Sequence, residues 1–214
     1  MGTGYNPRIA TDGLIFALDA ANSRSYPGTG LTAFGLVGGA NGTLLNGTGF
    51  SSVAGGCWSF DGTDDGINTT INIDNDPLTI NAWVYCTEVT SVNGRGIVLS
   101  DNGGWDRGLE INDSKWGVHI GNNLYKVGTA LNNVWYHTSL SYSSNVWILY
   151  VNGSFVFSSS STTSPGSLAT IGRADYFSTR IFQGLIPQVL IYNRALTVQE
   201  IRQNYNATKG RYGL

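Results

Sequence analysis

Acidic residues gather at one short stretch in the first third of the chain. Asp61 is followed, after a glycine and a threonine, by the adjacent pair Asp64 and Asp65. Calcium takes about six to eight oxygen ligands, and adjacent carboxylates together with the carbonyls of a turn supply several of them. The spacing predicts a calcium site on Asp64 and Asp65, with Asp74 and Asp76 as weaker helpers. The alternative is local, because aspartates in turns also bond their own backbone amides.

Two loop segments combine an aromatic ring with groups that can bond hydroxyls. The first carries Trp105, Asp106 and Arg107 in a stretch too rich in glycine and polar residues to be a buried strand, and the second carries Asp175 and Tyr176. A sugar ring stacks on an exposed aromatic face while neighbouring polar side chains bond its hydroxyls. We therefore predict a loop rim of these five residues that contacts a glycan. For Trp105, a lid over the core edge and a subunit interface remain as alternatives.

The chain lacks the residue patterns of a hydrolase. Glu110 is followed two places on by Asn112 rather than by a second acid, and Asp113 would lie on the opposite face of a continued strand. Retaining glycosidases need two carboxyl groups about 5 to 5.5 Å apart across the scissile bond. His119 and His137 have no serine or cysteine in a nucleophile elbow to activate, so we interpret both as structural histidines. We predict no catalytic residue.

Short β-rich segments must position these groups. In residues 79–86 apolar residues alternate with a second set that includes Asn81 and Trp83, which is the period of a strand in a two-layer sandwich. Asn-Gly pairs such as Asn152-Gly153 supply the positive φ angles of two-residue hairpins. We expect strands at 14–19, 58–60, 78–86, 116–120, 134–142, 146–151, 168–171 and 182–192. Tryptophans within these segments are predicted to be mostly core: Trp58, Trp83, Trp135 and Trp147.

One helix is expected near the end of the chain. Thr197 and Glu200 have the spacing of a capping box, in which each side chain bonds the other residue's backbone N–H. The helix should cover residues 198–206, and Gly210 is a plausible stop. Residues 1–11 are expected to form an N-terminal arm.

Composition limits the partners. Of 214 residues only 12% are charged, and the net charge is −2, so the chain has neither a basic stripe for nucleic acid nor a polybasic cluster for anionic lipid. No apolar run approaches the roughly 18 residues of a membrane helix. A polar but weakly charged surface suits contact with neutral polymers. We therefore expect neither nucleic-acid binding nor membrane insertion.

The first residues indicate where the chain is made. Residues 1–8 contain no apolar core and no small-residue cleavage site, so they do not resemble a secretory signal. We expect a protein that matures in the cytosol in which it is synthesised. Cys57 and Cys86 are then expected to be reduced, buried thiols, with a disulfide between them as the alternative.

Four segments, in order, resemble the laminin-G-like, concanavalin A-type jelly-roll family: 58–65 (WSFDGTDD), 78–84 (LTINAWV), 149–153 (LYVNG) and 184–197 (GLI leading into IYNRALT). The opening, residues 12–28, and the ending, residues 203–214, look like the version found in structural proteins of tailed bacteriophages. The resemblance covers about residues 5–214, so it implies one jelly-roll domain over 1–214.

The resemblance implies a two-sheet antiparallel sandwich whose relatives mostly bind carbohydrate or protein, sometimes through calcium on the sheet rim. It also implies a virion location, with synthesis in the host cytoplasm. The chain departs from the family at residues 35–39 (GLVGG), where relatives commonly carry a polar stretch with an aspartate. That loss puts in doubt any rim site that relies on those groups.

Together these observations predict a non-enzymatic binding module of a phage particle, in a fibre, tail appendage or capsid decoration, that contacts a glycan or the host surface. Other virion proteins and further copies of the chain are the expected protein partners, joined through sheet faces or edges. The second hypothesis is a structural virion protein that holds subunits together without a ligand. A polysaccharide-degrading enzyme comes third.

Overall fold

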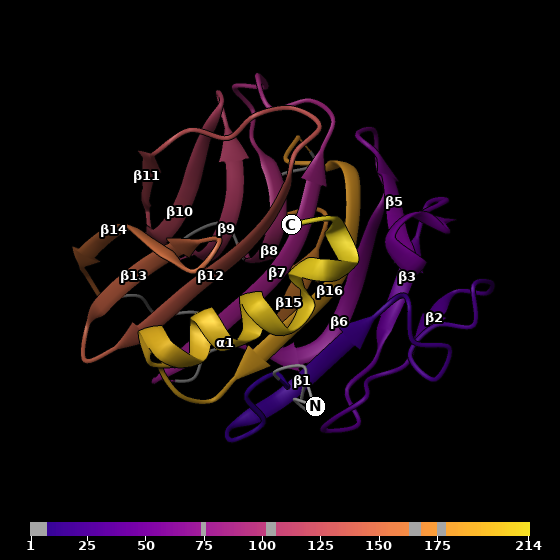
Figure 1. Cartoon of the computed structure of the whole chain (residues 1–214). Helices are drawn as coiled ribbons and strands as arrows, with labels where there is room; N and C mark the ends of the chain where they lie inside the picture. The colour runs from indigo at the N-terminus through magenta and orange to yellow at the C-terminus, as the bar shows by residue number, and fades with distance from the viewer. Residues whose placement is uncertain (1–7, 74–75, 102–105, 163–167, 175–178) are drawn as a thin grey trace.

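The computed structural model describes residues 8–73, 76–101, 106–162, 168–174 and 179–214, and of Asp106 only the backbone. Within these residues, sixteen strands form two antiparallel sheets that are stacked face to face (Figure 1). The prediction of an all-β, two-sheet antiparallel sandwich is confirmed.

One sheet, here called sheet A, has the strand order β14-β13-β12-β7-β16-β5-β4, with β1 also paired to β16. β1 and β5 lie end to end along β16, because Leu18 pairs with Val189 and Trp58 pairs with Ile186. The strands of sheet A are β1 (Leu14–Asp19), β4 (Gly49–Ser51), β5 (Cys57–Asp61), β7 (Leu78–Cys86), β12 (Trp135–Ser143), β13 (Val146–Val151), β14 (Ser154–Ser160) and β16 (Gln183–Tyr192).

The other sheet, sheet B, has the order β11-β10-β9-β8-β15-β6-β3-β2. Its strands are β2 (Thr32–Ala33), β3 (Gly42–Leu45), β6 (Gly66–Asn72), β8 (Arg95–Ser100), β9 (Asp106–Asn112), β10 (Lys115–Gly121), β11 (Asn123–Val127) and β15 (Leu168–Ile171). Both β6 and β8 are antiparallel to β15, so they begin at the same end of the sheet, here called the Gly66 end. β9 begins at the opposite end, the Asp106 end.

The main core fills the space between the sheets. In β7 the alternation read from the sequence is confirmed, since Ile80, Ala82 and Val84 belong to this core while Trp83 lies on the other face of the strand. Large rings complete the core, among them Trp58 and Trp147, which are fully buried. Apolar burial of this kind is the dominant favourable contribution to folding.

Turn chemistry was predicted in part. Asn152-Gly153 forms a two-residue hairpin with φ angles of 50° and 73°, between the paired residues Val151 and Ser154. Another of the Asn-Gly pairs, Asn41-Gly42, does not form such a hairpin, because Gly42 is the first residue of β3 and is not among the residues with positive φ. The pair Asp113-Ser114 joins β9 to β10 with φ angles of 54° and 59°, although it contains no glycine.

The described helical segments are one α-helix, α1 (Val198–Thr208), and two short 3-10 turns, η1 (Val53–Gly55) and η2 (Lys209–Tyr212). The predicted capping box is present, with Thr197 and Glu200 each bonding the other's backbone. The helix is two residues longer than expected, and the chain continues through Gly210 in η2 before Gly213 takes a φ of 74°. None of the described helices is long and apolar enough to cross a membrane.

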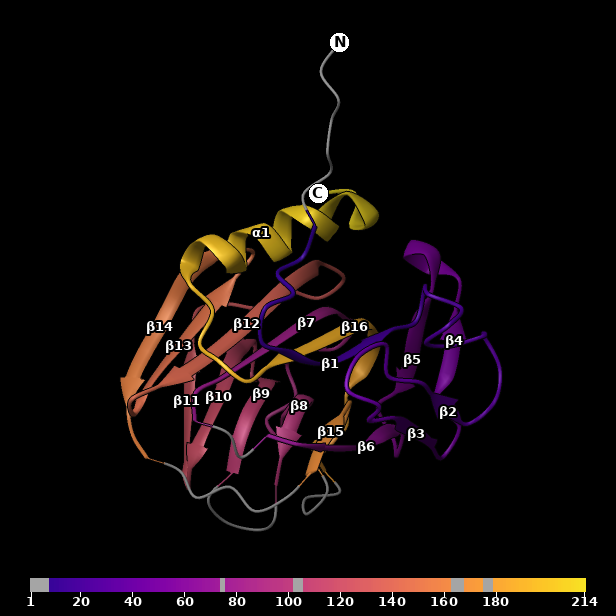
Figure 2. The same ribbon diagram turned by 90° about the horizontal axis from the view of Figure 1, so that it is seen from below.

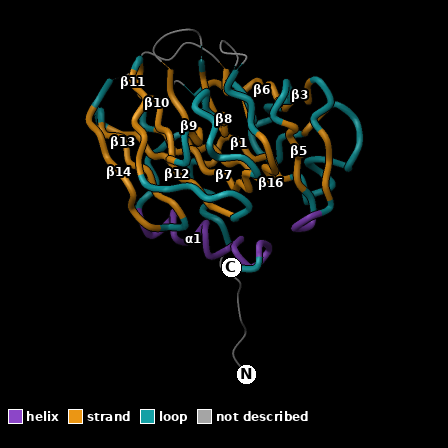
Figure 3. Tube along the Cα trace, turned by 90° about the horizontal axis from the view of Figure 1, so that it is seen from above, coloured by secondary structure: helices purple, strands orange, loops and turns teal. Residues whose placement is uncertain are grey.

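Helix α1 lies along the outer face of sheet A (Figures 2 and 3). The ring of Trp83 packs against Tyr205 and Tyr212, with centroids 5.8 and 4.0 Å away, and its Nε1 donates a 2.8 Å hydrogen bond to Thr208 Oγ1. Ile201 belongs to a second apolar cluster on this face. The helix therefore covers strands that would otherwise expose aromatic rings.

Residues 8–10, in the predicted N-terminal arm, are bonded to the helix side of the molecule. The Ala10 amide donates to Asn204 Oδ1 at 2.7 Å, and Tyr192 Oη donates to the Ala10 carbonyl at 2.9 Å. Gln203 Nε2 donates to the Arg8 carbonyl at 2.6 Å. These bonds attach the beginning of the described chain to its end.

Candidate functional site

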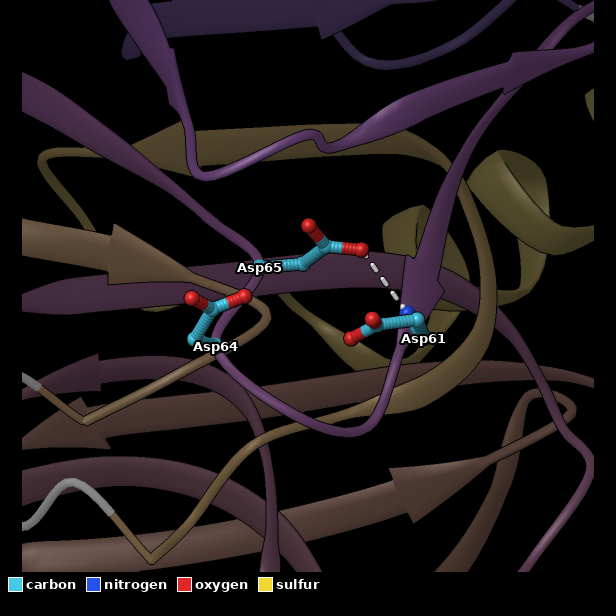
Figure 4. A group of neighbouring side chains, drawn as sticks. All are labelled: Asp61, Asp64 and Asp65. Atoms are coloured by element: carbon cyan, nitrogen blue, oxygen red, sulfur yellow. Dashed lines mark hydrogen bonds between the residues drawn. The ribbon is translucent and has the colours of Figure 1, made fainter.

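The carboxylate loop, residues 61–65, connects β5 in sheet A to β6 in sheet B. Asp61 Oδ1 accepts a 2.7 Å hydrogen bond from the Thr63 amide, and Asp65 Oδ2 accepts a 2.8 Å bond from the Asp61 amide. These bonds fold the loop so that Asp61, Asp64 and Asp65 approach one another (Figure 4). One carboxylate oxygen from each lies within 4.8 Å of the others.

The environments of the three carboxylates differ. Asp61 and Asp64 are exposed, whereas Asp65 is buried. Burial raises the pKa of Asp65, the bond from the Asp61 amide opposes that rise, and the charges of Asp61 and Asp64 add to it. A cation among these groups would favour the charged form of every one.

The carboxylate loop fits a hard cation such as calcium in ligand type, because it offers three carboxylates and the carbonyls of a turn. The prediction named Asp64 and Asp65, and the structure adds Asp61 to them. Asp76 is not a member of this group and lies exposed beside the start of β7, while Asp74 lies outside the described residues. Calcium binding itself stays a prediction.

The surroundings of the carboxylate loop are polar. Asn46 Nδ2 donates a 2.9 Å hydrogen bond to the Asp64 carbonyl. The Arg173 side chain crosses over Gly66, where an added Cβ would lie 2.1 Å from Arg173 Cδ. The loop thus lies at the Gly66 end of sheet B, beside the segment that follows β15.

A second group of polar side chains is buried on the outer face of sheet B. Glu110 on β9 is fully buried and accepts a 2.9 Å hydrogen bond from Asn112 Nδ2. His119 Nε2, from β10, lies 3.1 Å from Glu110 Oε2, and Arg180 Nε lies 3.6 Å from the same oxygen. The described contacts of Glu110 are thus to an amide, an imidazole and a guanidinium rather than to a second carboxylate.

Glycines pack closely against the Glu110 carboxylate. A Cβ added at Gly117 would lie 2.6 Å from Glu110 Cγ, and one at Gly94 would lie 2.7 Å from Glu110 Oε2. The Glu110 side chain is fully buried in this arrangement. The sequence analysis considered Glu110 and His119 separately and did not predict their contact. That contact depends on the register between β9 and β10, which is set by the turn at Asp113-Ser114 that was not predicted.

Most of the predicted loop rim lies outside what the structure describes. Trp105, Asp175 and Tyr176 are not among the described residues, and Asp106 is described only through its backbone, which begins β9 and pairs with Gly121. Their roles in binding therefore stay predictions.

Arg107 requires a correction, because the sequence placed it on an exposed rim. Only 1% of the residue is exposed, and Arg107 Nη1 donates a 2.7 Å hydrogen bond to the Ile73 carbonyl. Its guanidinium lies 5.4 Å from the ring centroids of both Tyr142 and Trp147. Since β9 directs this side chain into the sandwich, cation–π contacts replace solvent around it. Arg107 contributes to packing rather than to a ligand surface.

The two segments of the predicted rim, 105–107 and 175–176, are flanked by residues that lie at opposite ends of sheet B. Asp106 begins β9 at the Asp106 end of sheet B, beside Gly121. Arg173 lies against Gly66, and the Arg180 carbonyl accepts a 3.3 Å bond from the Gly96 amide, so both belong to the Gly66 end. The described residues thus do not bring the two segments together.

The other residues singled out in the sequence are mostly buried. His137 packs 5.3 Å from the Trp83 ring, and burial lowers the pKa of His137 to about 3, so it is neutral at pH 7. Trp135 is only half-buried, which corrects the expectation that it is mostly core.

Cys57 and Cys86 are buried free thiols rather than a disulfide, and burial raises the pKa of Cys57 to about 12 and that of Cys86 to about 11.

Residues 61–202, more than half of the chain, match the concanavalin A-like lectin/glucanases superfamily. The chain belongs to this superfamily. The match begins at the carboxylate loop and ends within α1, so both sheets contribute to it. The two-sheet arrangement is therefore that of a concanavalin A-like jelly roll, as the resemblance in the sequence implied. No curated protein matches the chain.

Solved structures with the same fold include enzymes and toxin domains. A Trypanosoma rangeli sialidase in complex with a difluorinated nononic acid is 19% identical, with a TM-score of 0.75 over 99% of this chain and 36% of the sialidase chain. The binding domain of botulinum neurotoxin DC in complex with SialylT is 13% identical, with a TM-score of 0.69 over 92% of this chain and 52% of that one. This chain thus spans about a third of the sialidase and half of the toxin domain, and the likeness is one of fold.

Proposed function

We propose that this chain is a carbohydrate-binding module without catalytic activity. Its membership of a lectin/glucanase superfamily supports the carbohydrate-binding part of the proposal. Two proteins of the same fold support it, since one is a sialidase in complex with sialic acid and the other is a toxin binding domain in complex with SialylT. Sialylated oligosaccharides therefore belong in a panel of test ligands, beside bacterial surface polysaccharides.

The environment of Glu110 supports binding over hydrolysis. A glycosidase needs a carboxylic acid that reaches the glycosidic oxygen and a second carboxylate across the bond. Glu110 is fully buried against Gly94, Gly117 and its polar neighbours, which argues against its contact with a substrate. We assign it to the support of the sheet face.

The proposed ligand surface is the loop at the Asp106 end, where Trp105 supplies a ring for stacking and Asp106 supplies hydroxyl-bonding oxygens. Asp175 and Tyr176 form a separate candidate surface, because their described neighbours Arg173 and Arg180 belong to the Gly66 end.

Calcium, in this proposal, is held by Asp61, Asp64 and Asp65. When bound, the ion would neutralise their mutual repulsion and cross-link the loop between the two sheets. Because the carboxylate loop lies at the Gly66 end and Asp106 at the other, calcium would act on stability rather than as a bridge to a sugar at Trp105.

We further propose a virion setting, with the chain made in the host cytoplasm and assembled beside other virion proteins and copies of itself. The resemblance of residues 12–28 and 203–214 to phage structural proteins supports it. Exposed apolar side chains near the edge strands β2 and β4 favour protein contacts: Leu31 is 69% exposed, and Phe50 is 41% exposed. The same exposed side chains also favour the second candidate function, that of a structural virion protein that binds no glycan.

The experiment that tests the ligand surface compares Trp105→Ala with Trp83→Ala, scoring glycan or host-cell binding and melting temperature for each. Trp83 is fully buried beneath α1, so its replacement should cost about 3 to 5 kcal/mol of stability. Trp105→Ala should weaken binding by about 1 to 3 kcal/mol while shifting stability far less. Normal binding by Trp105→Ala, or melting as early as Trp83→Ala, would reject the assignment.

A further inference from the structure

A row of polar side chains is enclosed between sheet A and helix α1. Asn81 on β7 pairs in register with Ser139 on β12, and one step along the same face Trp83 pairs with His137. Asn81 is 1% exposed, Ser139 is 0% exposed and His137 is 2% exposed. All three alternate along their strands with Ile80, Ala82 and Leu140 of the main core, so they lie on the opposite face of sheet A. Helix α1 covers this face of the sheet (Figure 2).

Several polar atoms of this row have no hydrogen-bond partner among the described residues. They are Oδ1 and Nδ2 of Asn81, Oγ of Ser139 and Nδ1 of His137. Thr79, the next residue on this face of β7, behaves differently: its Oγ1 donates to the Arg194 carbonyl at 2.7 Å and accepts from the Leu196 amide at 2.9 Å. The segment leading into α1 thus satisfies Thr79 directly and leaves Asn81 unpaired.

Complete burial of an unpaired side-chain amide is rare, because native proteins pair nearly all buried polar groups with protein atoms or with ordered water. Side chains directly opposite on antiparallel strands have Cβ atoms about 4.5 to 5.5 Å apart. Asn81 and Ser139 are therefore near enough to share one small molecule, although they do not bond each other.

We propose that Asn81, Ser139 and His137 form an internal water-binding site between sheet A and α1. Water both donates and accepts, so it can serve the amide N–H and the carbonyl oxygen of Asn81 as well as the Ser139 hydroxyl. Leu190 and Tyr150, which pair with Asn81 and Ser139 on their other sides, are buried members of the apolar cluster that includes Ile201. They enclose the polar row, so a water held there would exchange slowly with solvent.

The three side chains of the site are uncharged, as expected for a site that binds a neutral molecule. Burial lowers the pKa of His137 to about 3, so its imidazole is neutral at pH 7, and Asn81 and Ser139 carry no charge. Nδ1 of a neutral imidazole is either a donor or an acceptor, and water suits both tautomers. An ion would have no opposite charge among these three residues.

The test measures nuclear Overhauser effects between water and side-chain amides in ¹⁵N-labelled protein. Asn204 is a matched control, because it is as buried as Asn81 but its amide donates to Tyr192 Oη at 3.0 Å and its Oδ1 accepts from Ala10. A cross-peak from a long-lived water should appear at the Asn81 amide and be absent at Asn204. Absence of the cross-peak at Asn81 in the folded protein would overturn the proposal.

Two variants extend the test. Ser139→Ala should weaken the water cross-peak at Asn81, because it removes one of the water's partners. Asn81→Leu, of similar size but apolar, should lower the melting temperature by about 3 °C or more if the amide is satisfied by water. A raised melting temperature would instead mean that the native amide is unsatisfied, and the site would be rejected. If Asn81→Leu does not fold, the cross-peak in Ser139→Ala decides: an unchanged peak overturns the site.

Discussion

The carboxylate loop holds three acidic groups so close that they repel one another unless a proton or a cation lies among them. The pKa of Asp65 is raised mainly by burial, and the charges of Asp61 and Asp64 add to that rise while the hydrogen bond from the Asp61 amide opposes it. A bound cation would remove the cost by mass action on the folded state.

Calcium should therefore raise the melting temperature. At a calcium concentration about ten to a hundred times a millimolar-range dissociation constant, the stabilisation is about 1.4 to 2.7 kcal/mol, or about 5 °C for a chain of this length. Calorimetry in excess chelator and in excess calcium measures the difference. Asp64→Asn should abolish the shift, and Asp113→Asn, in the β9–β10 turn, should retain it. Identical melting curves in chelator and calcium would remove the metal hypothesis.

The buried His137 should make the protein sensitive to acid. Burial places its folded-state pKa at about 3, below an unfolded value of about 6.5, so between these pH values the unfolded chain binds the extra proton. The contribution of this group is complete above about pH 6.5 and is lost as pH falls toward 3, at about 1.4 kcal/mol per pH unit.

Urea denaturation at several pH values between about 4.5 and 6.5 measures this slope. His137→Phe keeps an aromatic ring beside Trp83 but cannot titrate, so its stability should depend less steeply on pH over this range. Equal slopes for the native protein and His137→Phe would mean that other groups cause the acid sensitivity.

At the scale of residues, the sequence predicted what depends on near neighbours. The clustering of Asp64 and Asp65 with Asp61 was visible because five positions of one turn bring them together. Arg107 was placed wrongly, because its burial depends on Tyr142 and Trp147, which approach it only once the two sheets are stacked. The Glu110–His119 contact was missed for a related reason, since strand register is not local.

At the scale of elements, α1 depends on a capping box that is observed in full. Glu200 also accepts hydrogen bonds from both terminal nitrogens of Arg194, at 2.9 and 2.6 Å, and this pair together with the Thr197 bonds lowers the pKa of Glu200 to about 2. The first turn of the helix is thereby attached to the end of β16.

Thr197→Ala should lower the free energy of unfolding by about 1 kcal/mol, because it leaves the Glu200 amide without its capping acceptor. Chemical denaturation measures the loss, and hydrogen exchange at the first amides of α1 should accelerate with it. Thr162→Ala is the control, since Thr162 is exposed outside any strand or helix. Equal stability of the two variants would show that the cap contributes nothing.

A second prediction at this scale concerns association of copies of the chain through the edge strands of the two sheets. β2 ends sheet B and β4 ends sheet A on the same side of the molecule (Figure 2), and Leu31 and Phe50 beside them are exposed. If copies associate through these edges, a Leu31→Ser, Phe50→Ser double variant should shift the mass measured by light scattering toward the monomer.

Helix α1 supplies the control for that experiment. Ile201 is fully buried, so its replacement would disturb folding, whereas Asn206 is exposed on the helix. Asn206→Glu should leave the mass unchanged. Dissociation by Asn206→Glu, with the edge variant still associated, would place the contact on the helix instead.

The helix and eight of the sixteen described strands coincide with predicted segments, because a strand with one buried face has a period of two and a capping box has a fixed spacing. The strands that were not predicted are β2, β3, β4, β6, β8, β9, β11 and β14. The turn at Asp113-Ser114 was not predicted either, since neither residue type requires a positive φ. The extension of the helix through Gly210 was missed as well. There Tyr212 is held against Trp83, a contact between distant parts of the chain that outweighs the weak local preference for a stop.

At the scale of the whole molecule, the sandwich separates the carboxylate loop from the proposed ligand surface at Trp105 and Asp106. The carboxylate loop lies at the Gly66 end, where Arg173 also lies, and Asp106 begins β9 at the other end. Helix α1 covers the outer face of sheet A, away from both of these loops. Chelation of calcium should therefore affect stability more than it affects glycan binding at Trp105.

The central claim is that the chain binds a glycan and leaves it intact. The most direct measurement incubates the folded protein with a panel of bacterial surface polysaccharides and sialylated oligosaccharides, captures the protein, and determines the mass of every retained glycan. We predict that at least one glycan is retained and recovered at its original mass. Retention of no glycan by folded protein, or recovery of shortened products that disappear with Glu110→Gln, would contradict the account.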